Sequence, residues 1–152
     1  IMNNFWKLVI SFVICFGVAF LGSLATDITG WYQTLQFPTW SPPSFVFPIA
    51  WNIIFFCMAL SFWIIWKNKA PKTAYWVFAI QLFFNLIWSP IFFQFHSLFG
   101  ALWVAAFLWL AVWANVIVFG RTSQLSAWLL VPYLLWTTFA FALNLNIYML
   151  NK

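Results

Sequence analysis

The sequence predicts an all-α integral membrane protein, a bundle of five transmembrane helices, on the basis of three observations. Hydrophobic residues make up 66% of the 152 residues and charged residues only 5%, whereas a soluble domain carries about 25% charged residues. Five segments are apolar over roughly 20 residues each, the length of helix that crosses a hydrocarbon core about 30 Å thick. Short polar stretches separate most of these segments. We therefore expect one membrane domain with almost no water-soluble part.

Helices are the expected state of these segments because lipid offers no hydrogen-bond partner to a backbone amide or carbonyl. A membrane-spanning barrel would instead show alternating segments of about 10 residues. The expected spans are, in chain order, residues 5–26, 45–66, 73–95, 98–119 and 125–149.

The connections between these spans differ in length and contain residues that favour turns. Residues 27–43 form the one long connection and carry one glycine and three prolines. The others are a polar stretch with Pro71 at 68–72, a tight break at 96–97, and Gly-Arg-Thr-Ser-Gln at 120–124. Glycine, proline and small polar residues interrupt helices at such points. The long connection is therefore the segment expected to cover a site.

One face of the first span is made of small residues at spacings of three and four, namely Ser11, Cys15, Ala19, Gly22 and Thr26. Small residues let a neighbouring helix approach closely in a membrane. We expect this face to pack against another span of the same chain rather than to form a dimer interface. A homodimer is nonetheless expected, since homo-oligomers are common, although the sequence identifies no face for it.

The few charged residues predict an orientation and exclude nucleic acid as a partner. Five basic residues fall on one side of the expected membrane: Lys7, Lys67, Lys69, Lys72 and Arg121. The other side holds Lys152, Asp27 and His96. Because positive charge favours the cytoplasmic side, we expect a multi-pass protein of the cell membrane with a cytoplasmic N-terminus and with residues 27–43 and the C-terminus outside. The basic residues form no continuous face of the kind that nucleic-acid binding needs.

Aromatic residues are unusually abundant, with 13 Trp, 21 Phe and 4 Tyr. Tryptophan favours the level of the lipid headgroups, and several tryptophans lie near expected span ends: Trp6, Trp31, Trp63, Trp66, Trp76 and Trp128. Trp51 and Trp88 instead lie roughly 9 Å inside their spans at 1.5 Å per residue, and Trp109 and Trp136 lie near mid-span. An indole N–H at that depth needs a hydrogen-bond acceptor inside the bundle.

Polar residues inside the spans point to the same region. A stripe at every fourth position of the third span consists of Gln81, Asn85 and Ser89. Two interpretations stay open for such groups: hydrogen bonds between helices, worth about 0.6 to 2 kcal/mol each, or the wall of a pocket. Both stay open for Gln81, Asn115 and Asn146. For Asn85 we favour the pocket, because Trp51, Trp88 and Trp136 are expected near its depth below the long connection.

The usual residues of catalysis and metal binding are missing from the sequence. It has one acidic residue, Asp27, and one histidine, His96, on connections that lead to different spans. A carboxylate pair, a catalytic triad or a metal cluster therefore cannot be assembled, and no metal or required cofactor is expected. Asp27 is expected to cap or end a helix, and His96 to lie at the membrane interface or cap a helix. Cys15 and Cys57 lie in apolar runs and are expected to behave as small hydrophobic residues.

Motifs along nearly the whole chain resemble those of the tryptophan-rich sensory protein, or translocator protein, family, which includes the peripheral-type benzodiazepine receptor. They are Trp31-Tyr32, Pro-Thr-Trp-Ser-Pro-Pro at 38–43 with Val46, Phe47 and Trp51, Asn-Leu-Ile-Trp-Ser-Pro-Ile-Phe-Phe at 85–93, and Pro-Tyr-Leu-Leu-Trp at 132–136 with Phe139, Ala140, Leu143 and Asn144.

The resemblance implies a five-helix membrane receptor that binds planar hydrophobic ligands. For the family these are porphyrins, including protoporphyrin and haem, and also isoquinoline carboxamides and benzodiazepines. Porphyrin or haem would be a ligand rather than a required cofactor. By motif position, the resemblance assigns the pocket to Tyr32, Pro42, Trp51, Phe55, Asn85, Trp88, Trp136, Ala140 and Leu143. Residues 27–43 would close it from outside.

Two alternative functions follow from the same resemblance. One is light- and oxygen-dependent degradation of protoporphyrin, which would assign the chemistry to Trp51 and Trp136, since a bound porphyrin is a photosensitiser and an indole beside it can relay a radical. The other is transport of tetrapyrroles or sterols. The spans contain no charged relay of the kind that couples ion flow to transport, which weakens the transport alternative.

Overall fold

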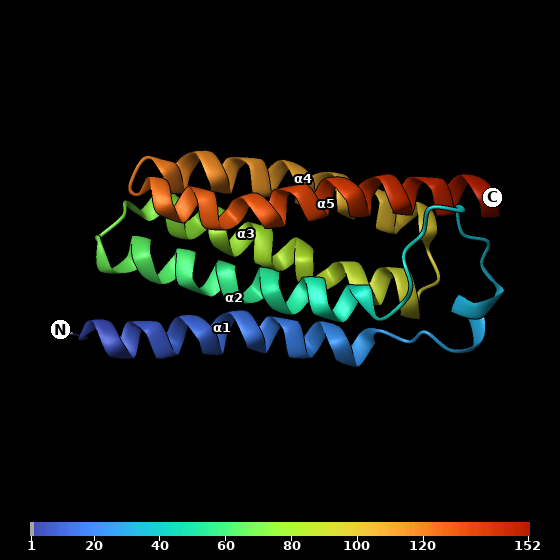
Figure 1. The fold of residues 1–152 in the computed structure, drawn as a ribbon, viewed down its shortest axis with the longest axis horizontal. Coiled ribbons are helices and arrows are strands. Elements are labelled where there is room, and N and C mark those ends of the chain that lie inside the picture. The colour runs from blue at the N-terminus through green and yellow to red at the C-terminus, as the bar shows by residue number, and fades with distance from the viewer. Residues whose placement is uncertain (1) are drawn as a thin grey trace.

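The computed structural model describes residues 2–152, and within that range the chain is helical and contains no strand. Five long helices lie side by side (Figure 1): α1 (Asn4–Ala25), α2 (Val46–Lys67), α3 (Lys72–Ser89), α4 (Leu98–Gly120) and α5 (Gln124–Asn151). Two short elements complete it, the 3₁₀ helix η1 (Gly30–Thr34) and the π-helical turn η2 (Pro90–Gln94). The predicted all-α bundle of five spans is confirmed, because all five helices are long and apolar enough to cross a membrane.

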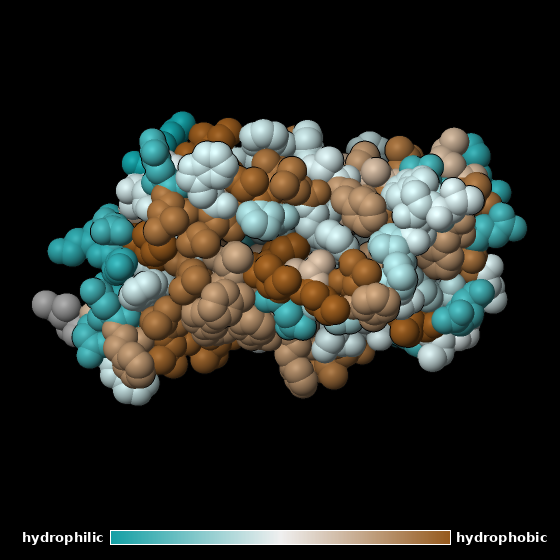
Figure 2. Space-filling view, in the orientation of Figure 1, coloured by the Kyte–Doolittle hydropathy of each residue, from teal (hydrophilic) through white to brown (hydrophobic). Residues whose placement is uncertain are grey.

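The two ends of the bundle differ in their connections. The N-terminus and the short turns between α2 and α3 and between α4 and α5 lie at one end (Figure 1), which we call the N-terminal end. The C-terminus, η1, η2 and the long connection lie at the other, which we call the loop end. Hydrophobic residues dominate the middle of the surface, and hydrophilic residues gather mainly at the two ends (Figure 2). This distribution suits a protein whose long axis crosses a bilayer.

Local sequence sets where several helices begin. The side chains of Asn3, Ser97 and Ser123 cap α1, α4 and α5, because each accepts a hydrogen bond from the backbone N–H three residues further along the chain. Such caps satisfy backbone donors that have no partner inside the helix. Two turns also need a left-handed backbone, at Lys69 with φ of 56° and at His96 with φ of 54°.

The sequence pattern predicts one continuous helix for the third span, but the structure divides this span into two parts. The α-helical part ends at Ser89, and the chain winds on as η2, in which the Phe95 N–H donates to the Pro90 carbonyl at 3.0 Å. Pro90 has no N–H to donate to the preceding turn, so the helical ladder is interrupted there. The wider π-helical turn brings Phe92 and Phe93 into buried positions.

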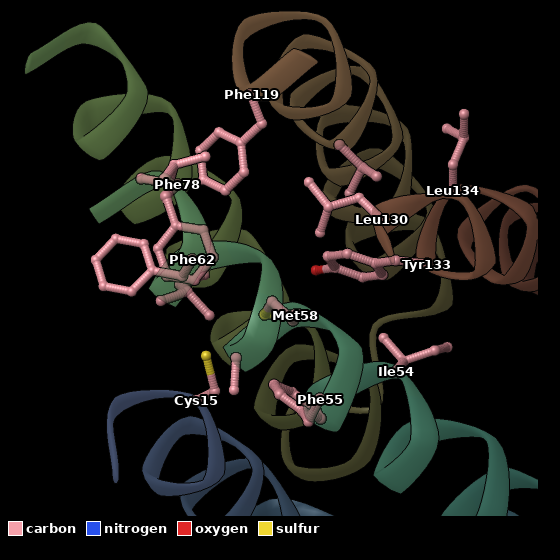
Figure 3. Packing of buried hydrophobic residues seen from close by; sticks show 14 of the residues in the cluster. Cys15, Ile54, Phe55, Met58, Phe62, Phe78, Phe119, Leu130, Tyr133 and Leu134 are labelled. Atoms are coloured by element: carbon pink, nitrogen blue, oxygen red, sulfur yellow. The ribbon is translucent and has the colours of Figure 1, made fainter. Parts of the chain in front are cut away.

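A buried core (Figure 3) lies mainly in the half of the bundle at the N-terminal end. The Phe62 and Phe78 rings stack at 4.4 Å, and Phe78 also stacks on Phe119 at 5.8 Å. Ser61 and Ser126 join α2 to α5, because each hydroxyl donates to the other residue's carbonyl, at 2.8 and 3.2 Å. This half is therefore closely packed and held by hydrogen bonds between helices.

The small face of α1 has two roles. Ser11 and Cys15 are fully buried, and the Ser11 hydroxyl donates to the Ala59 carbonyl of α2 at 2.5 Å. The expected packing within the chain is confirmed for these residues. Further along the same face, Ala19 packs against the buried core and Thr26 Oγ1 lies 3.5 Å from Ser89 Oγ of α3, while Ala19 and Gly22 also border a cavity.

Candidate functional site

A cavity of about 480 Å³ lies in the half of the bundle at the loop end. All five long helices, η1 and η2 contribute to its wall. The wall is mainly apolar and aromatic, and among the described residues it includes no charged side chain. Cavities of about 300 to 1,000 Å³ with a few placed polar groups are typical of small-molecule sites. The cavity therefore has the size and the lining of a small-molecule site.

One side of the cavity is formed by indole rings of α2 and α5. Trp51 and Trp136 meet edge to face, with ring centres 6.3 Å apart and planes at 86°. Phe47 packs edge-on against Trp136 at 5.6 Å, and Phe55 lies 5.8 Å from Trp51. Edge-to-face and tilted contacts of this kind are favourable for aromatic rings. The two tryptophans therefore brace each other and present a broad apolar surface.

The opposite side is built around Trp88 of α3. Its ring stacks on Phe92 at 4.8 Å, and its indole N–H donates to Asn144 Oδ1 at 3.0 Å. The Asn144 Nδ2 group in turn donates to the Leu98 carbonyl at 3.3 Å. Trp88 is thus fixed between three helices and η2.

The expectation that deep indoles find acceptors inside the bundle is confirmed in part. Trp88 donates to Asn144, as above, and the Trp109 N–H donates to Thr138 Oγ1 at 2.8 Å. Trp136 differs, because its buried Nε1 atom has no hydrogen-bond partner anywhere in residues 2–152. A buried N–H group without an acceptor lowers the stability of the folded protein by about 1 to 3 kcal/mol.

The polar stripe of α3 combines the two roles that the sequence left open. Asn85 borders the cavity, and its Nδ2 group donates to the Tyr133 hydroxyl at 2.8 Å. The Tyr133 hydroxyl donates to Gln81 Oε1 at 2.6 Å and points into the centre of the bundle (Figure 3). Gln81 is fully buried and joins α3 to α5, so it is an interhelical contact. Asn85 is both an interhelical contact and part of the wall.

The other two amides behave differently from interhelical contacts. Asn146 Nδ2 donates to the Ala142 carbonyl of its own helix at 2.8 Å. Asn115 is 1% exposed, and neither atom of its amide has a partner in the described chain.

The start of the long connection covers the cavity through η1. The Tyr32 ring borders the cavity and packs 5.5 Å from Phe93, and burial raises the pKa of its phenol. Trp31 stacks on His96 at 4.2 Å with an angle of 8° between the planes. Gly30 makes the turn into η1 with φ of 56°, a conformation that glycine adopts without strain.

The rest of the long connection is attached to α5. The Gln36 N–H donates to Asn151 Oδ1 at 2.9 Å, and Asn151 Nδ2 donates back to the Gln36 carbonyl at 2.8 Å. Trp40 packs edge-on against Phe139 at 5.7 Å, and Phe139 lies 5.2 Å from Trp136. The connection is therefore anchored at several points above the cavity.

Comparison with known proteins identifies the family. The model of the TspO/MBR family matches residues 11–150. The chain belongs to the TspO/MBR family. It is 34% identical over 150 residues to the tryptophan-rich sensory protein of Cereibacter sphaeroides, covering 99% of this chain and 95% of that protein. It is 37% identical to the tryptophan-rich protein TspO of Chlorobaculum tepidum, over 91% of both chains. It is 31% identical to the translocator protein of Bos taurus, over 88% of this chain and 83% of that protein.

Family membership and five apolar helices together make this TspO/MBR protein a multi-pass membrane protein. The family motifs assign nine residues to the pocket, and eight of them lie on the cavity wall. These eight are Tyr32, Trp51, Phe55, Asn85, Trp88, Trp136, Ala140 and Leu143. Pro42 is half-buried in the long connection and is not part of the wall. Ligand binding by these residues stays a prediction.

Several wall residues of the TspO/MBR protein were not singled out from the sequence. Ala105 and Leu108 of α4 close the cavity from behind, and α4 gave no signal because its apolar residues face both lipid and core. Ala19 and Gly22 were expected to contact another helix, and they border the cavity as well. Their spacing did mark the correct face of α1.

The acidic residue and the histidine of the TspO/MBR protein lie in the connections at the loop end. No three His, Cys, Asp or Glu side chains gather within residues 2–152. Asp27 follows the end of α1 and does not cap it. Its carboxylate accepts hydrogen bonds from the Thr29 hydroxyl at 2.5 Å and N–H at 2.9 Å, which lower its pKa. Asp27 therefore stabilises the turn that leads into η1.

Proposed function

We propose that this TspO/MBR protein is a membrane receptor for planar hydrophobic ligands, chiefly the tetrapyrroles protoporphyrin and haem. The observation that carries the proposal is a cavity of about 480 Å³ walled by Trp51, Trp88 and Trp136 and free of charged side chains among the described residues. Flat aromatic rings offer stacking surface to a macrocycle. Isoquinoline carboxamides and benzodiazepines would occupy the same cavity, because they too are apolar and aromatic. The relatives' names, which refer to sensing and translocation, agree with a ligand-handling role.

Equilibrium binding of protoporphyrin to the protein in lipid nanodiscs tests this proposal. We expect saturable binding to one site per chain and loss of binding in Ala140→Phe, because Ala140 borders the cavity. Ala79→Phe is the matched control, since Ala79 is exposed on α3 away from the cavity. Unsaturable binding, or equal binding by both variants, would contradict a receptor site in this cavity.

A second candidate function is light- and oxygen-dependent degradation of protoporphyrin at the same site. The contact between Trp51 and Trp136 favours it, because two oxidisable indoles then lie together on the wall. In this reaction the porphyrin absorbs light and is oxidised, oxygen is the oxidant, and an indole can relay the electron.

Illumination separates binding from degradation. Purified protein with protoporphyrin is exposed to light while the Soret band and the product mass are followed, with Trp51→Phe and Trp136→Phe as controls. If bleaching is no faster than for free porphyrin, the receptor proposal stands without the enzymatic one.

We also infer that the N-terminal end faces the cytoplasm of the cell. The support is that Lys7, Lys67, Lys69, Lys72 and Arg121 all lie in or beside the helix ends and turns of that end, and positive charge favours the cytoplasmic side. Labelling of Lys69→Cys and Thr39→Cys with an impermeant maleimide in intact cells tests it. Only Thr39→Cys should react. The homodimer stays a prediction, for which mass measurement in nanodiscs is the test.

A further inference from the structure

Exposure is unevenly distributed around the cavity wall. The wall residues of α3, α4 and α5 are buried or half-buried. The exposed wall residues are Ser23, Thr26, Ile28, Ser44, Pro48 and Asn52, and all belong to the last turn of α1, the ends of the long connection or the first two turns of α2. The cavity is therefore closed on three sides and open between α1 and α2.

The opening begins at the ends of α1 and α2 and continues below them to the level of lipid. Asn52 is six residues from the start of α2, which places it roughly 9 Å below that end at 1.5 Å per residue. The exposed apolar side chains near that depth are Phe20 of α1, which is 62% exposed, and Ile53 of α2, which is 55% exposed. A chain of exposed apolar residues at this depth of a transmembrane bundle faces acyl chains.

The polar side chains at the rim satisfy their own hydrogen bonds. The Ser23 hydroxyl donates to the Phe20 carbonyl at 2.7 Å, and the Asn52 Nδ2 group donates to the Pro48 carbonyl at 2.8 Å. Each bond lies within or next to the same helix. Polar groups satisfied in this way can face lipid at low cost. The rim therefore suits passage better than binding.

The top of the cavity, by contrast, is closed by the anchored connection. Trp31 stacks on His96, and Tyr32 packs on Phe93. The backbone of Gln36 donates one hydrogen bond to the Asn151 side chain and accepts another from it. A ligand that came from the water would have to break several of these contacts at once.

We propose that the opening between α1 and α2 is a side entrance through which an apolar planar ligand moves edge-on from the lipid leaflet at the loop end. The proposal rests on the proposed receptor function. It assigns Ser23 and Asn52 to the rim of the entrance and makes the long connection a fixed roof. Because the wall carries no charge among the described residues, a ligand's carboxylates stay at the headgroup level while its apolar edge leads.

Narrowing the entrance tests the route through kinetics. The association and dissociation rates of protoporphyrin are measured by stopped-flow absorbance in nanodiscs for wild type, Ser23→Phe and Asn52→Phe. An obstacle on the path slows both directions equally, so we expect both rates to fall about tenfold with little change in Kd. Leu24→Phe and Ile49→Phe are matched controls, because both residues are exposed next to the rim but are not part of the wall.

Releasing the roof provides the opposing test. Asn151→Ala removes both hydrogen bonds to Gln36. If the ligand enters by lifting the connection, association accelerates in Asn151→Ala. If it enters from the side, the rates stay those of wild type. Unchanged rates in the narrowed variants, or faster association in Asn151→Ala, would overturn the side entrance while saturable binding keeps the receptor proposal intact. Absence of saturable binding in wild type would instead remove the receptor proposal itself.

Discussion

Both halves of the bundle are rich in aromatic residues, but these residues fill one half and surround a cavity in the other. In the half at the N-terminal end, Phe62, Phe78 and Phe119 stack in parallel and fill the space between helices. In the half at the loop end, Trp51 and Trp136 meet edge to face around a cavity. Parallel stacks of Phe interdigitate closely, whereas Trp51 and Trp136 are held by their edge-to-face contact and Trp88 by its hydrogen bond to Asn144. The small side chains of α1 leave an open space beside these indoles.

We call the closely packed half at the N-terminal end the frame. The hollow half at the loop end contains the candidate site. All described wall residues belong to the hollow half. A path for transport across the membrane would have to pass through the packed core around Phe78. The receptor proposal therefore agrees better with the structure than the transport alternative. Substitutions in the two halves should therefore differ in their effects on stability and on ligand binding.

Shortening an aromatic side chain should lower the free energy of unfolding strongly only in the frame. Phe78→Ala should lower the free energy of unfolding by about 2 kcal/mol or more, because Phe78 is buried and stacks on two rings. The loss is smaller than in a soluble core, since lipid is as apolar as the side chain. Phe47→Ala should cost clearly less, because Phe47 already borders the cavity. Steric-trap unfolding in bicelles measures both, and equal losses would contradict the comparison.

Two similar indole hydrogen bonds should differ in their effect on binding. Trp88→Phe and Trp109→Phe each remove one bond, to Asn144 and Thr138 respectively, and each should lower stability by about 1 kcal/mol. Only Trp88→Phe should also weaken porphyrin binding, by about fivefold, because Trp88 borders the cavity and Trp109 does not. Titration in nanodiscs measures affinity. Weaker binding by both variants would show that the frame, not the wall, controls the site.

Removing the unpartnered indole N–H should not destabilise the ligand-free protein. Trp136→Phe deletes a buried donor that has no acceptor in the described chain. Its loss should leave stability unchanged or raise it by up to about 1 kcal/mol, offset by the smaller ring. Thermal unfolding without ligand, compared with Trp88→Phe, measures the difference. A loss as large as that of Trp88→Phe would mean that this N–H has a partner.

Acid should loosen the turn before η1 and spare the frame. The Asp27 pKa is lowered in the folded state by hydrogen bonds from Thr29, so its contribution is present above the ordinary carboxyl pKa of about 4 and is lost as pH falls through the lower folded value. Amide exchange of residues 28–34 should therefore increase below about pH 4. Asp27→Asn should abolish that pH dependence, and its persistence in the variant would assign it to another group.

The sequence by itself determined the properties that depend on neighbouring residues along the chain. Hydrophobic length located all five spans to within about two residues, and spacing identified the small face of α1. Each is a local property, since crossing lipid requires about 20 apolar residues whatever the other helices do.

Only the tertiary structure decided where space is left between the helices. It placed Ala105 and Leu108 on the wall, left Pro42 off it, and gave Trp88 an acceptor while Trp136 has none. The π-helical turn at Pro90 and the anchoring of residue Gln36 by Asn151 are likewise set by packing between distant segments. A cavity is the volume that five sets of side chains fail to fill together, so no single segment of sequence contains it.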